Sequence, residues 1–317
     1  MADVAVEKMA TREAYGKALA EFGAKYENLV VLDADLAAAT KTGVFKKAFP
    51  NRFFDCGIAE NDMINVACGL ALSGFIPFAS SFAMFAAGRS FEQVRNGVGY
   101  PHLNVKIGGT HGGITVGEDG ATHQCNEDIA LMRTIPGMVI INPADGVEAR
   151  LAVEAAINYY GPVYLRFGRF ATRILFDSSY KFEIGKGVQM AEGNDVAIVA
   201  TGLEVEQALI ARDLLANEGI SAAVVNIATI KPLDEDLVVA NAQKCGCVVT
   251  CEEHSVIGGL GGAVCETLSA KCPVPVLRVG VEDVFGRSGP AKELISYYGL
   301  DGASIAAKCK AAIALKK

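Results

Sequence analysis

Short apolar runs rich in β-branched residues alternate with stretches of helical periodicity along most of the chain. In the first half, the apolar runs predict strands at residues 29–35, 76–80, 103–109, 138–145 and 163–169. Helical patterns lie between them, at residues 11–27, 60–73, 84–97 and 146–160. This alternation is typical of mostly parallel sheets with helices on both faces, so the pattern predicts an α/β fold.

The alternation is interrupted at residues 171–193, where the sequence is polar and contains glycines. It resumes with predicted strands at 195–202, 222–230, 246–254 and 274–280, and with a predicted helix at 204–218. We therefore predict two α/β domains, residues 1–175 and 191–317, joined by a linker at 176–190. Ligands of such sheets bind beyond the carboxyl ends of the strands, which directs attention to polar residues after strands in the first domain.

The composition is that of a globular protein, with 51% apolar and 21% charged residues over 317 positions, a length that suits two domains. A formal net charge of −7 without a basic stripe argues against nucleic-acid binding. The first residues, MADVAVEK, carry charge where a signal peptide needs an apolar core. Nine cysteines without secretory context indicate reduced thiols. We therefore expect a cytoplasmic protein.

Three of these cysteines, Cys245, Cys247 and Cys251, lie close together in the sequence. A zinc site would need a CxxC pair or a matching histidine pattern, and neither is present. We interpret the three as small apolar residues of a strand and predict no metal ligands in this chain.

Glu60 lies at the head of an otherwise apolar predicted helix, in the stretch GIAENDMINVACGLAL. Residues 63–88 contain no Asp, Glu, Lys, Arg or His. This run is long enough to span a membrane, but its glycines and proline indicate a helix, a turn and a strand in a buried core. We therefore expect no membrane span, and a Glu60 carboxylate that faces an apolar wall.

The stretch GGTHGGITVGEDGATHQ, residues 108–124, is rich in glycine and contains His111 and His123, with Glu118 and Asp119 between them. Glycines let the backbone approach a ligand closely. Two histidines twelve residues apart on a loop are weak evidence for a metal site. A ligand-binding loop and a surface loop with solvated charges both fit the pattern.

Phe82 and Phe85 lie three residues apart just after a predicted strand. At helical spacing they would share a face. They are either core residues or a platform on which a flat ring stacks.

Three motifs resemble the transketolase family: GIAEND with its apolar helix, SFAMFAAGRSFEQVR, and THGGITVGEDGATHQ followed by INPADG. The resemblance runs in order over nearly the whole chain, to the pyrimidine-binding and C-terminal domains of transketolase. GEDGATHQ is its most specific part, because 1-deoxyxylulose-5-phosphate synthases and 2-oxo acid dehydrogenase β subunits differ there. It implies the smaller subunit of a split transketolase, which transfers a two-carbon ketol unit between sugar phosphates.

The resemblance also implies the cofactor thiamine diphosphate. The family holds the diphosphate through Mg²⁺ on a Gly-Asp-Gly motif, which this sequence lacks. We therefore expect a larger N-terminal subunit to carry that motif, the metal and the diphosphate. We expect this chain to be inactive alone and to assemble with the larger subunit and a second copy of itself as α₂β₂.

For the cofactor, the resemblance implies that Glu60 hydrogen-bonds the aminopyrimidine nitrogen N1′ and shares its proton. Phe82 and Phe85 match the aromatic residues that stack on the pyrimidine. A further contact in the family falls at Gly88 here, which has no side chain to supply it. Asp35 and Leu36 match an acidic-apolar pair near the cofactor.

For the substrate, the resemblance assigns sugar contacts to His111, Asp119 and His123, with His111 toward the phosphate end. Their imidazoles are accessible in neutral or charged form near pH 7. Arg169 matches the arginine that binds the sugar phosphate with bidentate geometry. Arg166 is the competing choice, but the odd offset in a strand would put the two arginines on opposite faces.

Two other functions remain open. The chain could be the β subunit of a 2-oxo acid dehydrogenase or of another thiamine-diphosphate enzyme. The THQ sequence and Arg169 argue against this alternative. It could also be a non-catalytic, nucleotide-sensing subunit, because residues 252–268 carry glycines before a helix. Their GGLGG spacing departs from the dinucleotide fingerprint, and Glu60 argues against this reading.

Overall fold

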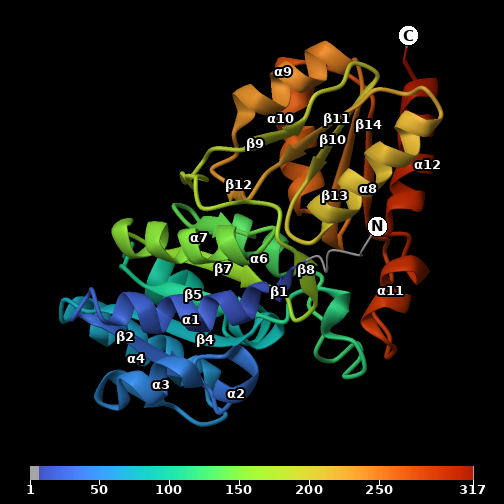
Figure 1. Cartoon of the computed structure of the whole chain (residues 1–317). Helices are drawn as coiled ribbons and strands as arrows, with labels where there is room; N and C mark the ends of the chain where they lie inside the picture. Colours follow the sequence, from blue (N-terminus) through green and yellow to red (C-terminus); the bar gives the residue numbers. More distant parts are fainter. Residues whose placement is uncertain (1–6, 317) are drawn as a thin grey trace.

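The computed structural model describes residues 7–316 and is shown in Figure 1. Its N-terminal part is built on a seven-stranded sheet. The strand order is β12-β6-β7-β5-β4-β2-β3. These strands are β2 (Leu29–Asp33), β3 (Phe53–Asp55), β4 (Ile76–Phe82), β5 (Lys106–Thr110), β6 (Val139–Ile141), β7 (Val163–Phe167) and β12 (Thr229–Lys231). All neighbours run parallel except β12, which is antiparallel to β6. The carboxyl ends of the parallel strands therefore meet at one edge.

Helices cover both faces of this sheet. On one face, α1 (Thr11–Gly23) and α7 (Gly146–Asn158) bury an apolar cluster around Tyr15, Phe78 and Phe167. The other face carries α4 (Glu60–Leu72), the π-helices η2 (Met84–Arg89) and η3 (Val94–Gly99) on either side of α5 (Phe91–Gln93), and α6 (Asp128–Arg133). Short helical segments complete this part: α2 (Ala37–Thr40), α3 (Gly43–Ala48), η1 (Pro50–Arg52) and η4 (Ile114–Val116).

The C-terminal part has a five-stranded sheet of order β14-β13-β10-β11-β9. Its strands are β9 (Val188–Ala191), β10 (Val196–Ala200), β11 (Ala222–Asn226), β13 (Val248–Ser255) and β14 (Val276–Val281), parallel except for β9. Helices α8 (Glu204–Asn217) and α12 (Gly302–Ala314) cover one face, and α9 (Glu235–Cys245) and α10 (Leu260–Lys271) cover the other. Helix α11 (Ala291–Tyr297) precedes α12, and β1 (Lys8–Ala10) pairs with β8 (Ala171–Arg173).

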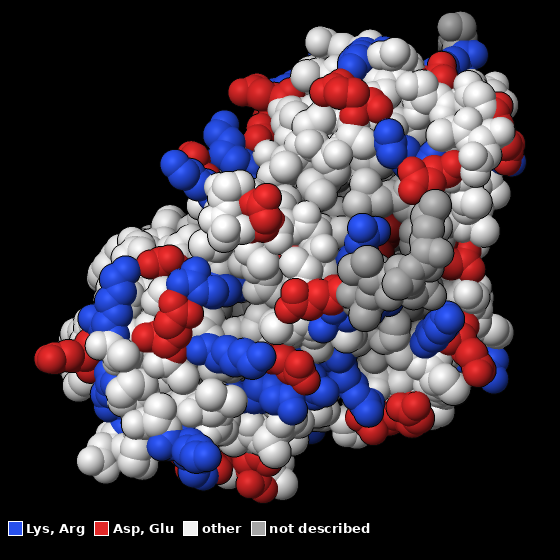
Figure 2. Space-filling view, viewed as in Figure 1, with Lys and Arg blue, Asp and Glu red and all other residues white. Residues whose placement is uncertain are grey.

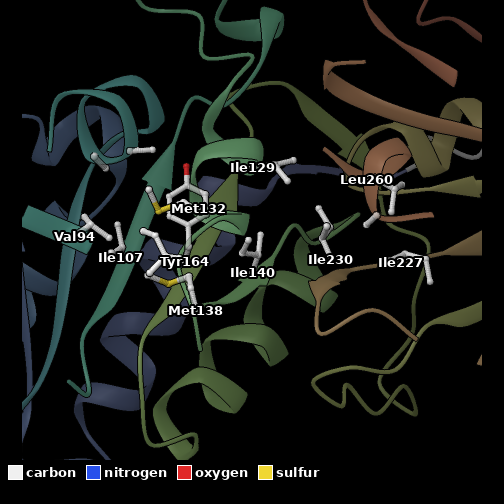
Figure 3. Packing of buried hydrophobic residues seen from close by; sticks show 14 of the residues in the cluster. Val94, Ile107, Ile129, Met132, Met138, Ile140, Tyr164, Ile227, Ile230 and Leu260 are labelled. Atoms are coloured by element: carbon white, nitrogen blue, oxygen red, sulfur yellow. The ribbon is translucent and has the colours of Figure 1, made fainter. Parts of the chain in front are cut away.

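One buried apolar cluster connects the two sheets (Figure 3). It runs from Val94 and Ile107 on the α4 face of the first sheet, through Ile140 and Ile230, to Leu260 at the start of α10. Apolar contacts of this extent fix the two parts against each other, because separating them would expose the cluster to water.

The structure confirms the α/β prediction and the predicted strands, and it corrects three details. The predicted strand 222–230 is two strands, and the second, β12, leaves its own sheet to pair with β6. The predicted helix 84–97 is η2, α5 and η3, mostly π-helical. The predicted connector at 171–193 contains β8 and β9, which pair with distant segments that local sequence does not reveal.

The described residues 7–316 also bear on the membrane span, the cysteines and the surface charge. None of their helices combines the length and hydropathy that a bilayer crossing needs. The nine cysteines all lie in this range and are free thiols. Of the three that were predicted to lie in a strand, only Cys251 does, because Cys245 ends α9 and Cys247 precedes β13. Basic and acidic side chains are interspersed on the face shown in Figure 2.

Candidate active site

Glu60 is the first residue of α4, and its side chain is 3% exposed. The helix N-terminus favours a carboxylate there, because the unpaired N–H groups carry partial positive charge. Both carboxylate oxygens accept hydrogen bonds from Nη1 of Arg89, at 3.1 and 3.0 Å. Burial of Glu60 is as expected, but the expectation of a charge-free wall is wrong. Arg89 follows the uncharged run directly, and η2 folds it back over α4.

Phe82 and Phe85 form a platform beside this ion pair. Phe82 ends β4 and Phe85 lies in η2, and their rings are nearly parallel, with an interplanar angle of 9° and centroids 6.0 Å apart. The guanidinium carbon of Arg89 lies 4.6 Å from the centroid of Phe85, a cation–π contact. The acidic group and the aromatic platform therefore meet at a single arginine.

His111 follows β5 and packs against the same platform. Its ring stacks on Phe82 with centroids 3.8 Å apart and an interplanar angle of 25°. The ring nitrogen Nε2 lies 2.8 Å from Nη1 of Arg12, and Nδ1 lies 2.9 Å from the Thr110 hydroxyl. A guanidinium can only donate, so Nε2 accepts and the proton of the neutral ring is on Nδ1.

Electrostatics keep this imidazole neutral. Burial, followed by the positive charges of Arg12, Arg169 and Lys41, lowers the pKa of His111 to about 3. The sequence left the neutral and charged forms open near pH 7; the structure excludes the charged form for His111. In its neutral form the ring orients its neighbours by hydrogen bonding.

Arg12 is a site residue that sequence reasoning missed. It lies at the start of α1, donates from Nη1 to Ala39 O at 2.9 Å as well as to His111, and has a buried Nε without a partner among residues 7–316. Burial and the nearby Arg169 lower the pKa of Arg12. Two close guanidiniums with an unpaired buried N–H suit a bound anion. No motif or spacing in the sequence predicts that Arg12 contacts His111.

Arg169 contacts the glycine-rich loop. Its Nη1 donates to Val116 O and lies 3.6 Å from Glu118 and 3.9 Å from Asp119. Its side chain is 38% exposed, so it remains accessible. Asp119 is exposed and joins the site through Arg169. The acidic pair balances the charge of Arg169.

Arg166 is excluded as an anion ligand by its contacts. It is buried, with Nε 2.7 Å from Asp128 Oδ2 and with Nη2 donating to Cys125 O and Glu253 O. The opposite-face argument was wrong, because β7 ends at Phe167 and Arg169 is not in the strand. Arg166 instead connects the first part of the chain with β13.

His123 completes the group that we call the aromatic cluster, which comprises Phe82, Phe85, His111 and His123. Its ring meets Phe85 edge-on, with centroids 5.5 Å apart, and its Nδ1 lies 2.9 Å from the Thr122 hydroxyl. The cluster thus collects residues from β4, η2 and both ends of the loop 108–124.

The C-terminal part holds this loop in place. Gln124 Nε2 donates to Arg287 O at 2.9 Å, and the Thr115 N–H donates to Glu253 Oε1 at 2.7 Å. Gly286 permits the first contact, because a Cβ there would come within 1.8 Å of Gln124 Oε1. Sequence reasoning attributed no part of the site to this half of the chain.

Asp35 and Leu36 are outside this group of contacts. Asp35 is exposed with a φ of +61°, and its N–H donates to Asp55 Oδ1 at 3.1 Å. The Leu36 N–H donates to the buried carboxylate of Asp33 at 2.6 Å. Within the described chain, no hydrogen bond or ion pair joins either residue to Glu60 or the aromatic cluster.

A hollow of about 640 Å³ opens beside the platform. Its lining residues come from η2, the loop and the C-terminal part: Met84, Phe85, Gly88, Arg89, Ala121, Thr122 and Phe285. Gly88, at the position that carries a further contact in the family, has no side chain, and the Met84 methyl group fills the adjacent space, since a Cβ at Gly88 would come within 2.2 Å of Met84 Cε. A buried carboxyl, stacked rings and adjacent space fit a flat heteroaromatic ring. No cluster of three or more potential metal ligands occurs between residues 7 and 316.

The sequence matches two family profiles, "Transketolase, pyrimidine binding domain" over residues 7–173 and "Transketolase, C-terminal domain" over residues 185–305. A relative from Methanocaldococcus jannaschii, named provisionally as a transketolase C-terminal section, is 54% identical over 298 residues, 93% of each chain. The 6-deoxy-6-sulfo-D-fructose transketolase subunit SqwH of a Clostridium species is 44% identical over 303 residues, covering 96% of this chain and 94% of its own.

A solved structure titled "Split gene transketolase, inactive beta4 tetramer" has the same fold, with a TM-score of 0.91 and 51% identity. The match covers 98% of this chain and 100% of that one. Human transketolase is 36% identical over 304 residues, and these residues make up only 48% of the length of the human protein. This chain therefore belongs to the transketolase family, whose members generally use thiamine diphosphate and a divalent metal, and it is of the split-subunit type.

Proposed function

We propose that this chain is the small subunit of a split thiamine-diphosphate-dependent transketolase, which transfers a two-carbon ketol unit between sugar phosphates. The observation that carries the proposal is the buried Glu60 carboxyl beside the stacked pair Phe82 and Phe85. An acidic group next to an aromatic platform is what an aminopyrimidine needs, because it can be hydrogen-bonded at its edge and stacked on its face.

The protein residues position the cofactor and handle one proton. When bound, thiamine diphosphate supplies the carbon nucleophile that attacks the ketose carbonyl. Glu60 would hold the pyrimidine nitrogen N1′ by a hydrogen bond and share a proton with it, which would tune the basicity of the neighbouring amino group. Phe82 and Phe85 would hold the ring by stacking and exclude water. Asp35 and Leu36 belong to the proposed cofactor surroundings only through the family resemblance.

The substrate would lie between the aromatic cluster and the arginines. Neutral His111 lies against Arg12, and Arg12 together with Arg169 offers guanidinium groups to a phosphate. His123 and Asp119 lie farther along the loop, where they would hydrogen-bond sugar hydroxyls, with His123 as a catalytic residue near the carbonyl. The carboxylates at positions 118 and 119 would have to release Arg169 when the phosphate binds.

A larger partner subunit would supply the Mg²⁺ and diphosphate site, because this sequence contains no Gly-Asp-Gly motif. The relatives described as a section and a subunit support a two-chain enzyme. We propose that the assembly contains a second copy of each chain. We also propose the domain division predicted above, residues 1–175, 176–190 and 191–317. The two family profiles support it, since they leave residues 174–184 unmatched.

The test is reconstitution. The chain is mixed with a candidate larger subunit, thiamine diphosphate and Mg²⁺, and ketol transfer from xylulose 5-phosphate to ribose 5-phosphate is measured. We expect transfer with both chains and none with either chain alone. Binding of the cofactor without transfer, together with decarboxylation of a 2-oxo acid, would favour the dehydrogenase alternative. No cofactor binding in any mixture would favour a non-catalytic subunit.

A second substrate class follows from the relative named for 6-deoxy-6-sulfo-D-fructose. A sulfonate is a tetrahedral anion like a phosphate, so the Arg12 and Arg169 guanidiniums could bind either. The same reconstituted complex is therefore assayed with the sulfosugar as donor. A higher kcat/KM for the sulfosugar than for xylulose 5-phosphate would reassign the substrate while leaving the ketol transfer intact.

A further inference from the structure

Arg89 is a charged residue of the site to which the proposed function gives no role. It ends the π-helix η2, and π-helical turns are frequent at functional sites. Its guanidinium makes two contacts at once, with both carboxylate oxygens of Glu60 and with the face of Phe85. These are the two groups that the proposed function assigns to the aminopyrimidine.

The two uses of Glu60 are incompatible. Toward Arg89, the carboxylate accepts hydrogen bonds on both oxygens. Toward a pyrimidine nitrogen, which is itself an acceptor, the carboxyl must donate a proton. The guanidinium also fills the space over Phe85, with its central carbon 4.6 Å from the ring centroid. A flat ring cannot stack on that face until the guanidinium leaves.

The hollow beside Phe85 provides space into which the Arg89 side chain can move. Its side chain is 49% exposed and lines the hollow of about 640 Å³ beside Phe85. Rotation into that hollow keeps the charge in contact with water, so displacement needs little desolvation. Glu60, in contrast, is buried and fixed at the start of α4, so the arginine is the partner that moves.

We propose that Arg89 holds the aminopyrimidine position in the cofactor-free chain and competes with the cofactor for Glu60 and Phe85. This positioning role rests on the proposed function. It keeps the buried carboxylate paired before assembly, and an unpaired buried charge would be costly. Cofactor binding then includes breaking the Arg89–Glu60 pair.

The test is the affinity of the reconstituted two-chain complex for thiamine diphosphate with Mg²⁺, measured by calorimetry. Arg89→Met keeps the apolar stem but removes the competing charge, so we expect binding about 5- to 30-fold tighter than in the wild type. Arg89→Lys keeps the positive charge but lacks the planar guanidinium, so its affinity should lie between those of the wild type and Arg89→Met. Arg95→Met is the matched control, because Arg95 is exposed on η3 and donates only to Asn96.

Two further comparisons isolate the competition. Salt screens the half-exposed pair, so the ratio of the wild-type to the Arg89→Met dissociation constant should fall toward one as NaCl rises. In a Glu60→Gln background, which removes the charge of the pair but leaves the Phe85 contact, Arg89→Met should tighten binding by a smaller factor than in the wild-type background. Both readouts are binding constants, so they do not depend on turnover.

The outcomes separate this inference from the proposed function. If the wild-type complex does not bind thiamine diphosphate, the proposed function fails and this inference falls with it. If the wild type binds and Arg89→Met binds equally or more weakly, Arg89 is not a competitor and only this inference is overturned. Tighter binding by Arg89→Met, with Arg95→Met unchanged within about twofold, supports it.

Discussion

Replacing Glu60 by glutamine separates proton transfer from packing. Glutamine has the same shape, can still accept a hydrogen bond from Arg89 and can still donate one to a ring nitrogen. It cannot hand over a proton. We therefore expect the fold, assembly and cofactor binding to survive in the reconstituted complex while turnover is lost. Glu60→Ala should lose turnover as well and also leave a cavity.

The magnitudes follow from the contacts. The Arg89–Glu60 pair has one partner that is 49% exposed, so its loss should lower the free energy of unfolding by no more than about 1 kcal/mol. Loss of a positioned proton donor costs about 10²- to 10⁴-fold in rate, which corresponds to about 3–5 kcal/mol of transition-state stabilisation. The effect on rate should therefore far exceed the effect on stability.

The assay is ketol transfer at saturating cofactor, with calorimetry for cofactor affinity and urea unfolding for stability. Asp62→Asn is the control, because it removes another acidic residue from the first turn of α4 where the side chain is exposed. We expect cofactor affinity within about tenfold of the wild type for Glu60→Gln. Near-normal turnover of Glu60→Gln would refute the proton-transfer role.

Three other predictions concern the arginines, His111 and Glu148. Arg12→Ala and Arg169→Ala should each raise KM for phosphorylated sugars about 10- to 100-fold with little change in kcat; equal losses with non-phosphorylated sugars would place the phosphate elsewhere. His111, whose pKa is lowered to about 3, should show a neutral ring with the proton on Nδ1 in ¹⁵N NMR from pH 8 to pH 5, and a titration near pH 6.5 would contradict this. Burial raises the pKa of Glu148 from 4.5 to about 7, so the folded chain holds a proton that the unfolded chain releases between these pH values. Its contribution to stability is therefore lost as pH rises through that window, and Glu148→Gln should gain up to about 3 kcal/mol relative to the wild type from pH 4.5 to pH 7.5 in urea unfolding; a pH-independent difference would count against this.

Local patterns were sufficient for most of the fold. Apolar runs predicted β2, β4, β5 and β7 because a strand buried on both faces needs continuous apolar residues. The short strand β12 could not be assigned this way. β12 follows a strand of the C-terminal sheet in the sequence but pairs with β6 of the N-terminal sheet. Pairing between segments so far apart in the sequence produces no hydrophobic periodicity that could predict it.

The family motifs likewise identified residues, and the structure decided their surroundings. Phe82, Phe85 and His111 meet in one cluster. This is expected, because each lies at or just after the carboxyl end of a strand, and in a parallel sheet these ends share one edge. Arg12 was missed because it comes from the start of α1, 99 positions before the histidine that it contacts. The charge beside Glu60 was missed because η2 turns the residue after the uncharged run back toward it.

The sequence by itself determined the α/β class, the helix–turn–strand order of the uncharged run 63–88 and the chemical types that gather at the strand ends, because hydrophobic periodicity and residue identity are local properties. The expectation that this run is buried was wrong for its outer face, since the side chains of Leu72 and Phe75 are 75% and 37% exposed. Only the tertiary structure decided which partner each buried or half-buried charged side chain meets. Arg89 on Glu60, Arg12 on His111 and Arg166 on Asp128 are pairs set by how packed elements meet. The electrostatic energy of a pair depends on the distance between the two groups and on their burial, and neither can be read from the amino-acid sequence.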